Sequence, residues 1–238
     1  MEISFLSILA LGFVLGIKHA IEPDHVIAVS TIASQSKKLV KSTLAGVFWG
    51  IGHTATLFII GVILILMKGD IPEKWAMSLE FLVGIMLVYL GLTTIRSFKD
   101  IHIHQHGHDG EHHKHVHSHV NAGQHQHQHQ HRNVSYLKSL FIGLVHGLAG
   151  SGAMVLLTMS TVKSVWEAAI YILIFGAGTI LGMLFFTTII GIPFVFSAKK
   201  QVLNRTLTRL TGFISVAFGV YYMYNLAITE GLYKLWLQ

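Results

Sequence analysis

Residues 42–67 read STLAGVFWGIGHTATLFIIGVILILM, an unbroken run without a single Asp, Glu, Lys or Arg. A helix needs about 20 apolar residues to cross the hydrocarbon core of a bilayer, so this run predicts a membrane span. The chain of 238 residues is 52% hydrophobic and only 12% charged, whereas soluble domains carry about 25% charged residues. The composition therefore argues against a soluble globular protein and predicts one that lies in a lipid bilayer.

Other uncharged runs along the chain predict further membrane spans. Three are long enough to cross a bilayer as they stand, and two shorter ones reach that length when extended past a flanking charge. The long runs are Ser139–Val162, Ala168–Ala198 and Leu210–Thr229, and the shorter runs are Ile3–Ile17 and Phe81–Ile95. We therefore expect an all-α polytopic membrane protein with six transmembrane helices. Cysteine is absent, which excludes disulfides, thiolate zinc sites and cysteine nucleophiles.

The distribution of Lys and Arg predicts how the chain is oriented in the bilayer. Twelve of the 17 lie in the first, third and fifth connections, within 37–41, 96–138 and 199–209. Four lie in the second and fourth connections and the C-terminal tail. Because cytoplasmic loops are rich in Lys and Arg, we expect both termini outside and the long third connection in the cytoplasm. The net charge of +6 then reflects topology, and no nucleic-acid partner is expected.

The two halves of the chain, 1–100 and 138–238, carry similar patterns of glycine at a nearly constant offset. The matched pairs are Gly16 with Gly143, His19 with His146, Gly52 with Gly178, Gly84 with Gly212, and Gly91 with Gly219. Three spans in each half would make the second half inverted relative to the first. Such 3+3 inverted repeats are typical of secondary transporters, with the substrate site near the bilayer midplane. The alternative is that these are unrelated packing glycines.

The run KHAIEPDH at residues 18–25 concentrates ionisable side chains directly after the first span. Ionisable groups at membrane depth are costly and usually functional. Imidazole and carboxylate groups are ligands for divalent Ni, Co, Zn and Cu. We therefore consider His19, Asp24 and His25 candidate metal ligands, with Glu22 as an additional one.

Pro23 predicts a break in the helix that carries this run. It lacks an N–H group and clashes with the carbonyl of His19, four residues earlier. A break would let Asp24 join the histidines and would free the His19 carbonyl to face a ligand or water. The alternative is an interfacial cluster in which Lys18 and Glu22 form an i, i+4 ion pair and Pro23 only ends a helix.

A second candidate region lies within the uncharged run of residues 42–67. His53 follows Gly52 there, and Thr54 follows it. This histidine is either a metal ligand or a structural hydrogen-bonding residue. In the second half, His146 occupies the repeat position of His19 and is a candidate ligand or proton relay, while Ser151 falls where the repeat has Asp24.

The spacing His19-x4-Asp24-His25 resembles the HX4DH signature of the nickel/cobalt transporter (NiCoT) family of secondary metal permeases. Gly52-His53-Thr54 is similar to the second motif of that family. The resemblance implies that His19, Asp24, His25 and His53 recognise the metal. Within this family, the chain is most similar to the short branch called urease accessory protein H, whose members are identified as nickel permeases supplying urease.

The resemblance also has implications for location and partners. It implies a multi-pass protein of the bacterial cytoplasmic membrane that transports Ni²⁺ or Co²⁺ and holds no resident cofactor. A cytoplasmic metallochaperone is an expected indirect partner in urease maturation. The sequence departs from the family in two respects. The larger family has eight spans with its signature on the second, and the acid expected after Gly182-Met183 is absent, although Thr187 and Thr188 lie nearby.

A histidine-rich segment joins the two halves. Residues 102–131 hold 13 of the 17 histidines, and most of them alternate with other residues. The alternating runs are His102, His104, His106 and His108; His113, His115, His117 and His119; and His125, His127, His129 and His131. Because nothing here can form a core, we expect 101–137 to be a disordered cytoplasmic loop that binds metal weakly. The alternative is a solvated linker without that role. Deleting this segment should spare transport.

These features lead to a main hypothesis and two rivals. The main hypothesis is a permease that imports Ni²⁺ or Co²⁺, and the chain lacks the G-x-x-x-x-G-K-[ST] loop through which ATP could be hydrolysed. The first rival is an efflux protein that uses the same site. The second is an intramembrane hydrolase built on His146 and Ser151, but five residues along one helix is the wrong geometry for such a pair. We therefore do not expect an enzyme.

Overall fold

The computed structural model describes residues 5–67, 72–97, 101–108, 111–118, 135–161 and 164–237, without side chains for 101–108, 111–118 and 151–161. Its described helices include four that are long and apolar enough to cross a membrane, and a bent pair that would make a fifth span. The four are α3 (Leu39–Met67), α4 (Glu73–Arg96), α6 (Val165–Ser197), and α7 (Gln201–Tyr224) continued by the π-helix η1 (Asn225–Thr229). The described residues thus give four to five candidate spans, whereas six were expected.

The bent pair consists of α1 (Phe5–His19) and α2 (Pro23–Ala33), whose axes differ by 56°. Pro23 occupies the first turn of α2, where its missing N–H costs nothing, and Glu22 precedes it with extended backbone angles. The predicted helix break is confirmed. The prediction that the break would free the His19 carbonyl is wrong, because the Glu22 N–H donates to that carbonyl at 3.1 Å. The turn between the two helices restores the hydrogen bond that proline removes.

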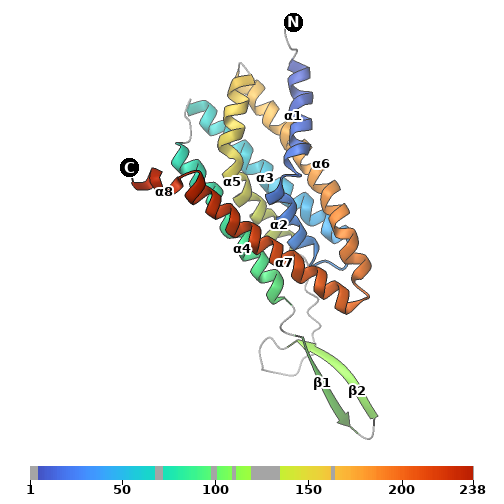
Figure 1. Cartoon of the computed structure of the whole chain (residues 1–238). Helices are drawn as coiled ribbons and strands as arrows, with labels where there is room; N and C mark the ends of the chain where they lie inside the picture. The colour runs from blue at the N-terminus through green and yellow to red at the C-terminus, as the bar shows by residue number, and fades with distance from the viewer. Residues whose placement is uncertain are drawn as a thin grey trace.

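The remaining predicted span, Ser139–Val162, corresponds to α5 (Tyr136–Thr161). Its apolar stretch with described side chains, Tyr136–Gly150, is shorter than a full bilayer crossing. A short helix that was not predicted, α8 (Leu232–Leu237), follows η1. Figure 1 shows the helices as one elongated bundle, with both chain ends toward the part of the bundle away from the strands.

Four helix pairs make most of the contacts in this bundle: α1 with α6, α3 with α5, α3 with α6, and α4 with α7. Glycines let the paired backbones approach closely. A Cβ atom on Gly16 would clash with the Phe175 carbonyl, and one on Gly178 would clash with the Phe13 carbonyl, so α1 and α6 touch through their main chains. In α3 and α5, Gly52 lies against Leu140 and Gly143 against Trp49; in α4 and α7, Gly84 lies against Gly219 and Gly91 against Gly212.

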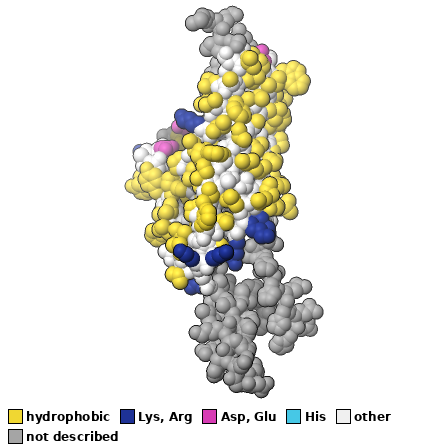
Figure 2. Space-filling view, turned by 90° about the vertical axis from the view of Figure 1, so that its right-hand side faces the viewer, with side chains coloured by type: hydrophobic (Ala, Val, Ile, Leu, Met, Phe, Trp, Pro, Cys, Tyr) yellow, Lys and Arg dark blue, Asp and Glu magenta, His cyan; other side chains and the backbone are white. Residues whose placement is uncertain are grey.

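The outer surface of the bundle is apolar. Figure 2 shows hydrophobic side chains over most of the visible face, with Lys and Arg gathered mainly at the end next to the strands. Large apolar side chains such as Leu6 and Phe196 are 76% and 80% exposed. Such exposure would be costly in water, and it suits contact with lipid.

The histidine-rich segment contains an antiparallel hairpin, β1 (Ile101–His108) and β2 (Glu111–Ser118), drawn below the bundle in Figure 1. In its register, His102 is opposite His117, His104 opposite His115, and His106 opposite His113. This differs from the disorder expected over 101–137. Each of the two runs has histidine at every second residue, which suits a β-strand, and each provides the other with a partner for backbone hydrogen bonds. Residues 119–134, with His119, His125, His127, His129 and His131, lie outside the described residues.

Candidate metal centre

Four histidines from four different helices meet inside the bundle. They are His19 at the end of α1, His25 in α2, His53 in α3 and His146 in α5. His25, His53 and His146 are buried, with relative exposures of 1%, 0% and 2%. All four ionisable groups that the sequence assigned to the main site, together with His146, therefore lie in one place, because Asp24 also belongs to this cluster.

The first possible ligand set consists of His19, His25 and His53. Each of these residues offers a ring nitrogen, and the three nitrogens lie within 4.8 Å of one another. The Nε2 atoms of His19 and His53 are 3.1 Å apart. Both rings also lie close to that of His25, with centroid distances of 4.5 Å from His19 and 5.1 Å from His53. Three convergent imidazoles are a ligand set suited to Ni²⁺, Co²⁺, Zn²⁺ or Cu²⁺.

The second set consists of Asp24, His25 and His146, and it shares His25 with the first. Asp24 Oδ2 is 2.8 Å from His146 Nε2, and Asp24 Oδ1 is 3.2 Å from His25 Nδ1. The rings of His25 and His146 are 4.0 Å apart at their centroids. This set adds a carboxylate, and hence a negative charge, to two imidazoles.

Several buried ring nitrogens have no hydrogen-bond partner among the described residues. They are His25 Nε2, His53 Nδ1 and His146 Nδ1. A buried polar atom without a partner is costly, so most such atoms in proteins are paired with protein, water or an ion. These nitrogens are therefore available to a metal ion or its water ligands.

The surroundings of the cluster orient its rings. Glu22 Oε2 lies 2.9 Å from His19 Nδ1, and Nε2 of the same ring faces His53. Carboxylate partners of this kind fix the orientation of a ligating imidazole and raise its basicity. Two aromatic side chains close the cluster: Trp49 lies 5.6 Å from the His146 ring and Phe175 lies 5.5 Å from the His19 ring, centroid to centroid.

Close helix packing brings the second half of the chain to this cluster. Gly143 and Gly147 of α5 lie against the α3 backbone at Trp49 and His53. His146, between these two glycines in sequence, is thereby held next to Asp24 and His25. Trp49 was not identified from the sequence, in which one tryptophan in an apolar run resembles any other core residue.

The remaining candidate residues have different surroundings. Thr54 is buried, but its hydroxyl donates to the Gly176 carbonyl at 3.3 Å and joins α3 to α6. Glu22 pairs with His19, and not with Lys18 as the alternative interpretation required. The side chain of Ser151 lies outside the described part of the chain, as do those of His102, His104, His106, His108, His113, His115 and His117.

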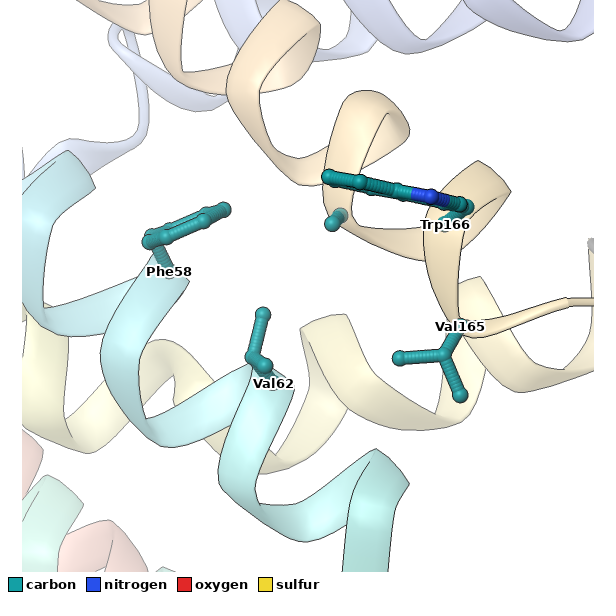
Figure 3. A pocket seen from close by; sticks show the side chains of 5 residues that line it. Phe58, Val62, Val165 and Trp166 are labelled. Atoms are coloured by element: carbon teal, nitrogen blue, oxygen red, sulfur yellow. The ribbon is translucent and has the colours of Figure 1, made fainter.

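A depression on the outside of the bundle contrasts with this cluster. It lies between α3 and α6 and is lined by Phe58, Val62, Val165, Trp166 and Ala169 (Figure 3). None of these side chains can bind a cation through an imidazole or carboxylate. The depression therefore does not contribute to the candidate metal centre.

The chain is similar in sequence to several known proteins. The family model described as cytochrome C biogenesis protein transmembrane region matches residues 11–221. Urease accessory protein UreH of Bacillus sp. (strain TB-90) is 59% identical over 237 residues, which cover 100% of this chain and 99% of that protein. Chloroplast proteins FOR GROWTH AND FERTILITY 1 and 2 of Arabidopsis thaliana are 23% and 25% identical over 215 residues, 88% of this chain and 56% and 53% of their lengths. No solved structure matches the chain.

These matches agree with the apolar helices of the fold. A transmembrane family model that covers most of the chain, together with several helices of spanning length, shows an integral multi-pass membrane protein. Similarity to a urease accessory protein over the full length agrees with the branch that the motif resembles.

Proposed function

This chain belongs to the family described as cytochrome C biogenesis protein transmembrane region and is a homologue of UreH, and from this premise we propose that it is a secondary transporter importing Ni²⁺ or Co²⁺. The proposal rests on one observation. The side chains of His19, His25, His53 and Asp24 converge inside the bundle, at the break between α1 and α2. Discontinuous helices with inward-facing ionisable groups form ion sites in transporters.

The chemistry of the cluster suits this cargo. Neutral imidazoles favour divalent Ni, Co, Zn and Cu over hard cations such as Mg²⁺, which prefer oxygen ligands. Asp24 supplies a negative charge where a divalent cation would otherwise be poorly stabilised. The ion would exchange its water for ligands among His19, Asp24, His25 and His53 in the course of transport, and would leave when the two halves move relative to one another.

The packing of the helices supports a 3+3 inverted repeat with six spans. The contact of Gly16 in α1 with Phe175 in α6 corresponds to that of Gly143 in α5 with Trp49 in α3. The repeat relates α1 to α5 and α3 to α6. It therefore relates the contact between α1 and α6 to the contact between α5 and α3. The α4–α7 contact maps onto itself, because Gly84 meets Gly219 and Gly91 meets Gly212.

The proposed orientation has both termini outside the bacterial cytoplasmic membrane and the histidine-rich segment inside. The gathering of Lys and Arg at the bundle end next to the hairpin supports it. The membrane potential, negative inside, then favours import. Two elementary charges crossing it gain roughly 4.6 kcal/mol per 100 mV.

The histidine-rich segment would bind the same ions weakly on the cytoplasmic side. It would hold imported metal near the membrane before a metallochaperone carries it toward urease maturation. Homology to a urease accessory protein, with a transmembrane family domain, fits a role that is not enzymatic. Among the described residues, His146 Nε2 is paired with Asp24, which favours the transport hypothesis over the hydrolase alternative.

Uptake of radiolabelled Ni²⁺ or Co²⁺ into proteoliposomes with a negative internal potential tests the proposal. His25→Ala should abolish uptake, whereas Thr31→Val should transport normally. Thr31 is a suitable control because it is equally buried on α2 and its hydroxyl bonds only to the local Ala28 carbonyl among the described partners. Import would be contradicted if proteoliposomes that contain the wild-type protein accumulated neither metal. It would also be contradicted if deleting the gene made cells sensitive to the metal.

A further inference from the structure

We propose that the transported ion occupies two overlapping positions that share His25, and that it passes from one to the other during transport. This inference rests on the proposed function. The first position is formed by His19, His25 and His53, and the second by Asp24, His25 and His146.

The two positions differ in which half of the chain holds the ion. The first is formed by α1, α2 and α3, all from residues 1–100. The second is formed by α2 and α5, so an ion bound there links the two halves through His146. Transfer from the first to the second therefore converts an ion held by one half into an ion that bridges both.

His25 can serve both positions because its two ring nitrogens have different surroundings. Nδ1 lies 3.2 Å from Asp24 Oδ1, on the side of the second position. Nε2 is buried and has no hydrogen-bond partner among the described residues. We assign Nε2 to the first position and Nδ1 to the second, so that one ring is a ligand before and after the transfer.

We expect one ion to be bound at a time. The two positions lie side by side, since they share the His25 ring and the rings of His53 and His146 are 5.7 Å apart at their centroids. Two divalent cations this close would repel strongly in a medium of low dielectric constant. The positions are therefore used in turn.

The difference in charge between the two positions favours transfer from the first to the second. Three imidazoles in the first position are neutral when they bind a metal, whereas the second position contains the Asp24 carboxylate. The hydrogen bond of 2.8 Å between Asp24 and His146 closes the second position, and an ion that enters must replace it. Opening this hydrogen bond is thus the step that admits the ion to the interface between the halves.

X-ray absorption at the nickel edge tests the two positions separately by counting imidazole ligands in the purified full-length protein loaded with Ni²⁺. His146→Gln keeps a hydrogen-bond donor for Asp24 and should leave one bound ion with three imidazoles. His53→Gln should leave one bound ion with two imidazoles and a carboxylate. His25→Gln should weaken binding at least tenfold beyond either variant. Ser139→Ala, on the same helix as His146, is the control and should match the wild type.

Transport gives an independent readout. His146→Gln and Asp24→Asn should both bind Ni²⁺ through the first position, yet each should reduce uptake at least tenfold because the ion cannot advance. Wild-type uptake by His146→Gln would overturn the inference. So would two ions bound at once, or complete loss of binding in His53→Gln. A wild-type protein that binds Ni²⁺ in this way but does not transport it would refute the proposed function and leave the two positions standing.

Discussion

Substituting Gly143 with alanine should misplace His146 without changing any candidate ligand. An added Cβ would collide with the Trp49 carbonyl oxygen and lie 2.9 Å from the carbonyl carbon, closer than the roughly 3.5 Å at which carbon atoms pack. To relieve this overlap, α5 must move away from α3 by about 1 Å, since backbone atoms cannot rotate aside. His146 follows Gly143 by three residues on the same helix and must move with it.

The consequence of that movement can be worked out from the hydrogen bond to Asp24. The distance between Asp24 Oδ2 and His146 Nε2 is 2.8 Å and would become about 3.8 Å, beyond hydrogen-bonding range. A misplacement of about 1 Å in a functional site can cost about 100-fold in rate. Overpacking should also lower the free energy of unfolding by about 1–3 kcal/mol.

The assay is metal uptake in proteoliposomes together with thermal unfolding in detergent. Gly150→Ala is the matched control on α5, because among the described residues its new Cβ would meet only His53 Cε1 at 3.9 Å and Leu57 Cδ2 at 4.0 Å. It should transport normally, and alanine in place of glycine stabilises helices by about 0.5–1 kcal/mol. Equal uptake and stability in the two variants would refute the reasoning that α5 is held in register by main-chain contact.

Three further predictions concern the surroundings of the site. Glu22→Gln should weaken Ni²⁺ binding about 10-fold because Glu22 orients His19; an unchanged titration curve would show that the carboxylate plays no such role. Thr54→Val should keep uptake within about twofold of the wild type, since the Thr54 hydroxyl bonds to Gly176 and not to the cluster; a large loss would make it a ligand. Deleting residues 102–131 should preserve the initial rate of uptake and reduce the number of weakly bound ions measured by equilibrium dialysis; loss of uptake would make this segment part of the transport path.

Local features explain what could be predicted from the sequence. The absence of charges over residues 42–67 was sufficient to predict most of α3, and the ring of Pro23 was sufficient to predict the break after α1. Both effects act within one or two helical turns. The freed His19 carbonyl was predicted wrongly by the same local reasoning, because a single turn allows the Glu22 N–H to replace the lost donor.

Non-local contacts explain what could not be predicted. The repeat offset marked His146, but the contact of His146 with Asp24 crosses 122 residues of sequence and depends on how α5 packs against α3. Nor does spacing within one helix show that Trp49 closes the cluster. The pairing of β1 with β2 likewise depends on two runs finding each other, whereas each run alone predicts a solvated segment.

The cross-half packing of the helices also has a consequence for how the protein is made. The Thr179 hydroxyl donates to the Gly16 carbonyl at 3.2 Å, across 163 residues, and α3 has its largest contact with α5 in the same way. During synthesis, α1 and α3 therefore enter the membrane well before their main partners leave the ribosome. Until α5 and α6 insert beside it, the nascent first half lacks the helices that pack against it and bury its histidines. Two half-chains produced separately in one cell should assemble with each other, because each supplies what the other lacks.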